Sequence, residues 1–191
     1  ASRSEFWFGL IPFVGVILIE VLSGMLIGMV ISVIFLISTT SKPHIGRLGR
    51  VPETPGAYRD LDRHPENLPV PGVLIARLDS QMYYANALTT RDELKAMIAD
   101  AEPRIVIIDG AAQEEMDLTT TDIFEGLIKE LKSKEIDLYL AEIHEPLEEH
   151  ARETGLMDTV GEDHVFLTLD SAVQAAEAAL GGSDETQMTE E

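Results

Sequence analysis

A long apolar run near the start of the sequence most constrains what this chain can form. Residues 6–37 contain a single charged side chain, that of Glu20, and such a run is typical of a membrane segment. Only one basic residue, Arg3, precedes the run, which is also too long for the apolar core of a secretory signal peptide. One helix of this length would reach about 48 Å, against about 30 Å for the hydrocarbon core of a bilayer, and two full spans do not fit. We therefore predict a short transmembrane helical hairpin that breaks near residues 20–24, or a single tilted helix.

The membrane-embedded charge, Glu20, leaves two interpretations of residues 1–40 open. A carboxylate at mid-depth is costly in lipid and tolerable inside a helical bundle. A turn at that depth, for which Gly24 supplies a flexible backbone, also needs protein around it. We expect residues 1–40 to be the C-terminal transmembrane segment or segments of a larger bundle. The alternative is a lone anchor helix whose Glu20 reaches the membrane surface.

Residues 41–71 are predicted to be a juxtamembrane linker, because proline and glycine recur along them. Their arginines and Lys42 outnumber their carboxylates, and basic residues just after a span favour the cytoplasmic side of the membrane. Residues 46–50 resemble a phosphate-binding loop in glycine spacing only, since we expect no strand before them and no helix after them.

Residues 72–180 alternate between strand and helix patterns, which predicts an α/β domain with a sheet flanked by helices. The near-continuous apolar run at 104–109 suits a central strand that is buried on both faces. We expect strands at 73–78, 82–85, 104–109, 137–141 and 165–168, and helices at 90–101, 119–134, 146–154 and 171–180. The small, acidic tail at 181–191 is predicted to be disordered.

The composition excludes several functions. A formal net charge of −20 argues against nucleic acid as a partner, because phosphate binding needs clustered lysine and arginine. The absence of cysteine excludes disulfides, thiolate metal sites and a cysteine nucleophile. No nucleotide-binding, hydrolase or metalloprotease motif occurs, so we predict no enzyme, no catalytic residue, no metal and no cofactor. The acidity leaves adaptation to high salt open.

One local pattern stands out. Asp109 ends the central strand, and Asp117 with Thr119 and Thr120 opens the next helix. Aspartate and threonine are good N-caps, and Thr119 with Asp122 has capping-box spacing. The same residues form a candidate regulatory loop and helix N-terminus, whose positive end would favour an anion or a partner. Two aspartates repel an anion, so capping is the favoured interpretation, and the two roles are compatible.

The order of these motifs is that of a known family. Pro71 and Gly72 precede an apolar strand that contains Arg77, and residues 82–87 carry an aromatic pair followed by Ala-Asn-Ala. Both resemble the start of the STAS domain in sulfate permease (SulP) family anion transporters. Residues 107–109 and 117–127 resemble that family's third strand and the helix after it.

The resemblance covers most of residues 5–180. The segments at 141–147 and 155–157 resemble the next strand and helix. The apolar run and the motifs that follow it, such as those at 58–60, resemble the family's last membrane segments and their exit. The resemblance implies a STAS-like mixed sheet flanked by helices at 72–180.

The resemblance also implies a function. Members of the family resemble fourteen-segment secondary transporters that move sulfate, bicarbonate, chloride or dicarboxylates, with a cytoplasmic STAS domain that regulates or assembles them, often at a dimer interface. Related anti-sigma-factor antagonists are phosphorylated on a serine after the loop aspartate. Here Leu118 follows Asp117, so that serine is absent.

We therefore expect the C-terminal fragment of an inorganic-anion transporter of the cell (inner) membrane, with its STAS domain in the cytoplasm. Its expected partners are the remainder of the membrane domain, a second copy, and a regulatory protein or nucleotide. Because the anion site of such proteins lies among earlier segments, the chain alone should not transport. The alternative is a stand-alone, membrane-anchored STAS module that acts in protein–protein regulation.

Overall fold

The computed structural model describes residues 3–19, 21–40 and 44–188. The chain forms two compact units, residues 1–42 and residues 43–191. Each unit has its own internal packing, so the two are considered separately.

The first unit is a pair of helices, α1 (Arg3–Ile19) and α2 (Val21–Thr40). The structure thus has two helices here, as the hairpin interpretation predicts, and not one continuous helix; a place for them in a membrane stays a prediction. Glu20, which we placed at the break, lies outside the described residues. Gly24 is buried, and a Cβ atom on Gly28 would lie 3.4 Å from the Cβ of Pro12. The two glycines, four residues apart, share one face of α2 and let α1 approach closely.

Most of the hairpin's large apolar side chains remain exposed within the described residues. One aromatic contact joins the two helices: the rings of Phe8 in α1 and Phe35 in α2 have centroids 4.7 Å apart. Among the described residues, no helix combines the length and the hydropathy that a membrane crossing requires. The exposed apolar side chains are those of Phe6, Trp7, Phe8, Ile11, Phe13, Val14, Val21, Leu22, Met25, Leu26, Ile27, Met29, Val30, Val33, Ile34, Phe35 and Leu36.

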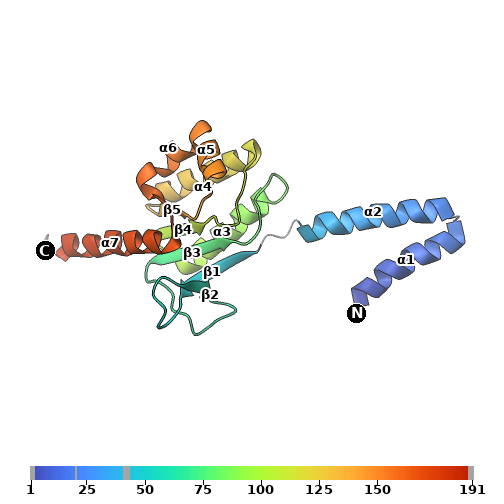
Figure 1. Ribbon diagram of the computed structural model, residues 1–191, viewed down its shortest axis with the longest axis horizontal. Coiled ribbons are helices and arrows are strands. Elements are labelled where there is room, and N and C mark those ends of the chain that lie inside the picture. Colours follow the sequence, from blue (N-terminus) through green and yellow to red (C-terminus); the bar gives the residue numbers. More distant parts are fainter. Residues whose placement is uncertain (1–2, 20, 41–43, 189–191) are drawn as a thin grey trace. The chain divides into compact units, whose positions relative to one another are not determined.

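The second unit is built on a six-stranded mixed sheet with the order β2-β1-β3-β4-β5-β6 (Figure 1). Its strands are β1 (Ile45–Arg50), β2 (Tyr58–Asp60), β3 (Val73–Leu78), β4 (Ile105–Asp109), β5 (Asp137–Ala141) and β6 (Val165–Phe166). The four strands β3 to β6 are parallel, and β1 pairs antiparallel with both β2 and β3. The expected mixed sheet flanked by helices is confirmed.

The three central strands are apolar on both faces, and this forces two layers of helices. Side chains alternate across a strand, so Leu74, Ala76 and Leu78 join one core cluster while Val73 and Ile75 join the other. The strands β4 and β5 divide in the same way. Neither face of the sheet can therefore be left to solvent.

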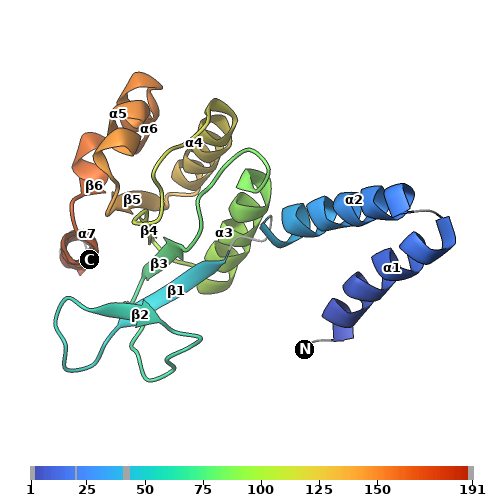
Figure 2. The same cartoon turned by 45° about the vertical axis from the view of Figure 1, so that its right-hand side comes forward.

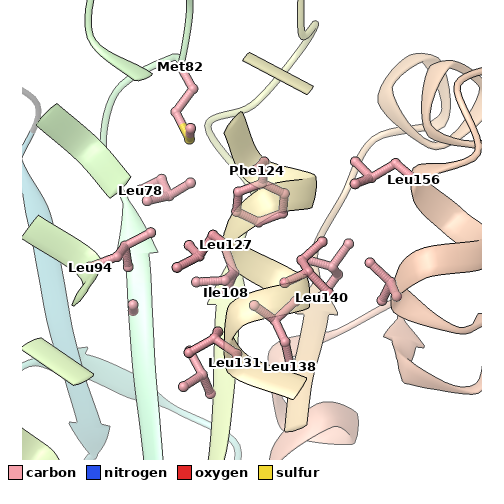
Figure 3. Close-up of a cluster of buried hydrophobic side chains, with 14 of the residues drawn as sticks. Leu78, Met82, Leu94, Ile108, Phe124, Leu127, Leu131, Leu138, Leu140 and Leu156 are labelled. Carbon is pink, nitrogen blue, oxygen red and sulfur yellow. The ribbon is translucent and has the colours of Figure 1, made fainter. Parts of the chain in front are cut away.

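The first face is covered by α3 (Ala87–Ala101), α4 (Leu118–Ser133), α5 (Glu145–Glu153) and α6 (Leu156–Val160). Figure 2 shows these helices on one side of the sheet. In the core between them, Phe124, Leu127 and Leu131 of α4 lie against Ile108 and the leucines of β5 (Figure 3). Their spacing of three and four residues places them on one face of α4.

Among the described helices, only α7 (Leu169–Met188) covers the second face. Leu169, Ala172, Val173 and Ala176 form the buried stripe of this helix. Small side chains there allow α7 to lie close to Ile105 and Ile107 of the sheet. A short 3-10 turn, η1 (Glu162–His164), leads into the edge strand β6.

The predicted linker at 41–71 is wrong in one important respect, because it supplies the strands β1 and β2. Residues 46–50 accordingly belong to the strand β1 and do not form a phosphate-binding loop. Proline is typical of loops, and Pro52 and Pro55 do lie in the connection between the two strands. Gly49 is needed within β1, since a Cβ atom there would lie 2.9 Å from the carbonyl oxygen of Leu68.

Two smaller expectations are also wrong. Residues 82–85, expected as a strand, form a loop that leads into α3. Two of their amides bond to side chains of the neighbouring loop, Met82 to Gln113 and Tyr84 to Asp117, and not to a strand. The helix α7 continues to Met188, through part of the tail that we expected to be disordered. Glycine costs a helix only about 1 kcal/mol per residue, so Gly181 and Gly182 do not end it; residues 189–191 lie outside the described residues.

The fold predicts where the domain can be cut. A fragment of residues 72–191 lacks β1 and β2 and leaves β3 as an unpaired edge, which favours aggregation. We expect it to unfold at a lower urea concentration than the fragment 43–191, or to be insoluble. Urea unfolding followed by circular dichroism checks this, and equal midpoints would show that residues 43–71 are a linker after all.

Candidate functional site

Two loops meet at the carboxyl edge of the parallel strands, where ligand sites of such sheets usually lie. One joins β3 to α3 (residues 79–86), and the other joins β4 to α4 (residues 110–117). The side chain of Gln113 is buried between them: its amide nitrogen donates to the carbonyl of Ser80 at 2.8 Å, and its oxygen accepts from the amide of Met82 at 2.8 Å. Gln81, in the first loop, bonds to the second loop: its side chain donates to the carbonyl of Glu115 and accepts from the amide of Glu114. The two loops are therefore fixed to each other.

Asp117 caps α4 and adds a further bond between the loops. One carboxylate oxygen accepts from the amide of Thr120 at 3.0 Å. The other accepts from the Thr120 hydroxyl at 2.9 Å and from the amide of Tyr84 at 2.8 Å. The helix thus begins at Leu118, and the capping box that we predicted from Thr119 and Asp122 is wrong because Asp117 already holds the first free amides.

These bonds change the acidity of Asp117. Desolvation by its surroundings raises the pKa of its carboxyl, but the amides of Thr120 and Tyr84 and the Thr120 hydroxyl favour the charged form more strongly. The pKa of Asp117 consequently lies below its ordinary value. The carboxylate is charged at neutral pH, and its hydrogen bonds hold the start of α4 and the loop before α3.

The threonines after Asp117 have different environments. Thr120 and Thr121 are buried, and the Thr121 hydroxyl donates to the carbonyl of Asp117 and lies 3.3 Å from Nε2 of His150. Thr119 is exposed. A second histidine, His144, bonds through Nε2 to the carbonyl of Ala111 at 2.9 Å. His144 therefore supports the loop after β4, and His150 contacts the first turn of α4.

Asp109 has a separate role on the opposite face of the sheet. Its side chain is fully buried and accepts from Nε of Arg77 at 2.7 Å and from the amide of Ala111 at 3.1 Å. Arg77 is its register partner on β3. The predicted site residues therefore do not form one cluster. Asp117 and Thr120 are hydrogen-bonded to each other, Asp109 is bonded to Arg77, and Thr119 faces solvent.

The arrangement holds no recognisable catalytic machinery. No nucleophile–base–acid set is formed by these side chains, whose bonds are caps and loop ties. Within the described part of the chain, no group of three or more histidines and carboxylates could hold a metal ion. The site is suited to presenting a rigid surface.

Residues 64–172 match the model of one protein family, the STAS domain. This chain belongs to the STAS domain family. The match covers the sheet from the β2–β3 connection to the start of α7, and includes both loops of the site.

Longer relatives extend the likeness beyond the STAS domain. The chain is 33% identical to a probable sulfate transporter of Mycobacterium tuberculosis over 176 residues, 91% of this chain and 31% of the relative. It is 32% identical to sulfate transporter 1.3 of Arabidopsis thaliana over 91% of this chain and 27% of the relative. The chain thus spans about a third of the length of these relatives. The resemblance to sulfate permease family transporters is confirmed.

Solved structures support the fold. The murine anion transporter Slc26a9 in its inward-facing state matches 93% of this chain and 29% of its own with a TM-score of 0.78 and 20% identity. A sulfate transporter family protein from Wolinella succinogenes matches 64% of this chain and 99% of its own with a TM-score of 0.54 and 19% identity. These relatives are transporters and STAS domains, not enzymes.

Sequence reasoning missed three residues of the site. The sequence contains a sign of the pairing of Arg77, because Arg77 is a lone charge in an apolar strand and Asp109 is a lone charge at the end of the next one. The sequence gives no such sign for Gln113 and Gln81, because a glutamine in a polar loop does not reveal that its side chain will hydrogen-bond to another loop.

The capping role of Asp117 gives a pH-dependent prediction. We expect Asp117→Ala to lower the free energy of unfolding by about 1 kcal/mol at neutral pH. The carboxylate's share of this stabilisation is present above its ordinary pKa of 3.8 and is lost as pH falls through the lowered pKa. Urea unfolding of both proteins from pH 7 to pH 3 should show the difference shrinking. Thr119→Ala is the control, with almost no effect at any pH.

The buried ion pair gives a second prediction. Arg77→Met leaves the buried Asp109 carboxylate without its charged donor and should cost about 2–4 kcal/mol. Arg47→Met on the neighbouring strand is the matched control: its partner Asp100 is exposed, so the cost is about 0–1 kcal/mol. The double variant Arg77→Met/Asp109→Leu should recover much of the loss. Equal unfolding free energies for the two single variants would contradict the role assigned to Asp109.

Proposed function

We propose that this chain is the C-terminal part of a secondary inorganic-anion transporter of the sulfate or bicarbonate type. The observation that carries the proposal is the extent of the match to sulfate transporters. It covers 91% of the chain, although the STAS family matches only residues 64–172. The match must therefore extend well into the residues before 64, where the helical hairpin lies.

The hairpin's surface supports a place inside a larger helical assembly. Most of its described large apolar side chains are exposed, on both helices, and so large an apolar surface is normally covered by lipid or by other helices. In this proposal α1 and α2 form a short helical hairpin at the end of the transporter's membrane domain, in the cell (inner) membrane, where other helices surround it. Residues 43–191 are then on the cytoplasmic side.

The proposed role of the STAS domain is to regulate or assemble the transporter. Its candidate site is rigid and contains no catalytic set, which suits binding and not chemistry. A second copy of the transporter is the expected partner, and a cytoplasmic regulatory protein or nucleotide is a further one.

Uptake measurements test the proposal. The complete reading frame that encodes this chain should restore uptake of radiolabelled sulfate or bicarbonate to bacteria that lack their own transporter. Residues 1–191 alone should give none, because the anion site of such transporters lies among other membrane helices. Removal of residues 43–191 from the complete protein should reduce uptake severely, with the amount in the membrane measured in parallel.

The outcomes separate the proposal from its alternative. If the complete reading frame gives no uptake of any inorganic anion although it is present in the membrane, the transporter proposal fails. If that frame contains no further membrane helices, the stand-alone anchored STAS module replaces it.

A further inference from the structure

Three of the exposed large apolar side chains in the STAS domain gather at the candidate site. Tyr84 is 71% exposed, Leu88 is 52% exposed and Leu118 is 68% exposed. Tyr84 precedes α3, and the leucines lie in the first turns of α3 and α4, two helices that pack against each other. We call these three residues the loop-edge patch.

The loop-edge patch is held in a fixed shape. The amide of Tyr84 donates to the Asp117 carboxylate, one residue before Leu118. Asn86 accepts from the amide of Tyr83 at 2.9 Å and donates to the carbonyl of Gln81 at 2.9 Å. Together with Gln113, these bonds fix both sides of the patch. An exposed aromatic residue on a fixed backbone loses little entropy on binding, as in the anchor residues of protein interfaces.

The rim of the patch is acidic. Glu114 and Glu115 lie in the loop bonded to Gln81. Asp92 and Asp122 each follow a patch leucine by four residues, and so lie on the same helix face as that leucine. Asp117 adds a fifth carboxylate, and the one arginine nearby in sequence, Arg91, is paired with Asp92 at 2.7 Å.

This charge selects the kind of partner. A second STAS domain docking through the same patch would bring two acidic rims together, and like charges across an interface are costly. An anionic lipid surface is excluded for the same reason. An apolar centre with a negative rim fits a helix that presents apolar residues on one face and lysine or arginine beside them.

We propose that the loop-edge patch docks a cationic amphipathic segment from the cytoplasmic side of the transporter's own membrane domain. The inference rests on the proposed function. The chain spans about a third of the length of its relatives, so a transporter of that size has a large part outside this chain. Cytoplasmic loops of membrane proteins carry an excess of lysine and arginine, which is the charge that the rim requires.

Site-specific photo-crosslinking in the complete protein tests the proposal. A photoreactive phenylalanine analogue replaces Leu118 and, as the matched control, Leu167, which is also apolar and is 93% exposed but lies next to the edge strand β6. Membranes that contain each variant are illuminated, and the linked peptides are identified by mass spectrometry. We expect the analogue at position 118 to link to a lysine- or arginine-rich segment of the membrane domain, and the analogue at 167 not to link there.

Charge reversal provides the second measurement. Glu114→Lys/Glu115→Lys should reduce the crosslink from position 118 by about tenfold, because it places like charges across the interface. The reversal Glu149→Lys/Glu153→Lys on the exposed side of α5 should leave it unchanged. Circular dichroism of the domains confirms that the variants are folded.

The results also distinguish this proposal from the proposed function. A crosslink from position 118 to a second STAS domain, to a separate protein, or to nothing overturns the proposal, as does a crosslink that is insensitive to charge reversal. If uptake by the complete protein is normal in those cases, the transporter function still holds. If no membrane domain is encoded, the proposed function itself has failed.

Discussion

The parallel pairing of β3, β4 and β5 is the interaction on which the rest of the STAS domain depends. These strands are apolar on both faces, so burying one face leaves the other exposed to water. Helices α3 to α6 on one side and α7 on the other are the solution to this constraint. Parallel strands also bring their carboxyl ends to one edge, which is why the loops after β3 and β4 lie side by side.

The two loops at that edge are joined to each other by polar side chains, while Met82 and Met116 anchor them to the apolar core. Gln113, Gln81 and Asp117 satisfy backbone groups on the opposite loop, so that each loop is held by the other. Apolar side chains are then free to face solvent, as Tyr84, Leu88 and Leu118 do. A domain that needed those residues for its own core could not present them to a partner.

The two aspartates singled out in the sequence show why a local motif is an incomplete guide. Asp117 caps α4, as expected of an aspartate just before a helix, and its bonds to Thr120, three residues on, account for this role. Asp109 is bonded to Arg77, which is 32 residues away in the sequence and directly opposite in the sheet. The two residues are close only because of the strand register, which a motif does not encode.

The sequence by itself determined the central strands, predicted at 73–78, 104–109 and 137–141, most of the helices that cover them and the absence of cysteine chemistry. These features are fixed by local periodicity and composition, because a side chain's face follows from its position in a strand or helix. The sequence left a helical hairpin and a single helix open for residues 1–40. Tertiary structure decided that residues 45–50 and 58–60 are strands, since a segment with two glycines becomes a strand here only by pairing with β3. It also decided the burial of Gln113, the pairing of Arg77 with Asp109 and the gathering of three apolar residues on one surface. Each of these depends on segments distant in sequence that meet only when the parallel sheet has formed.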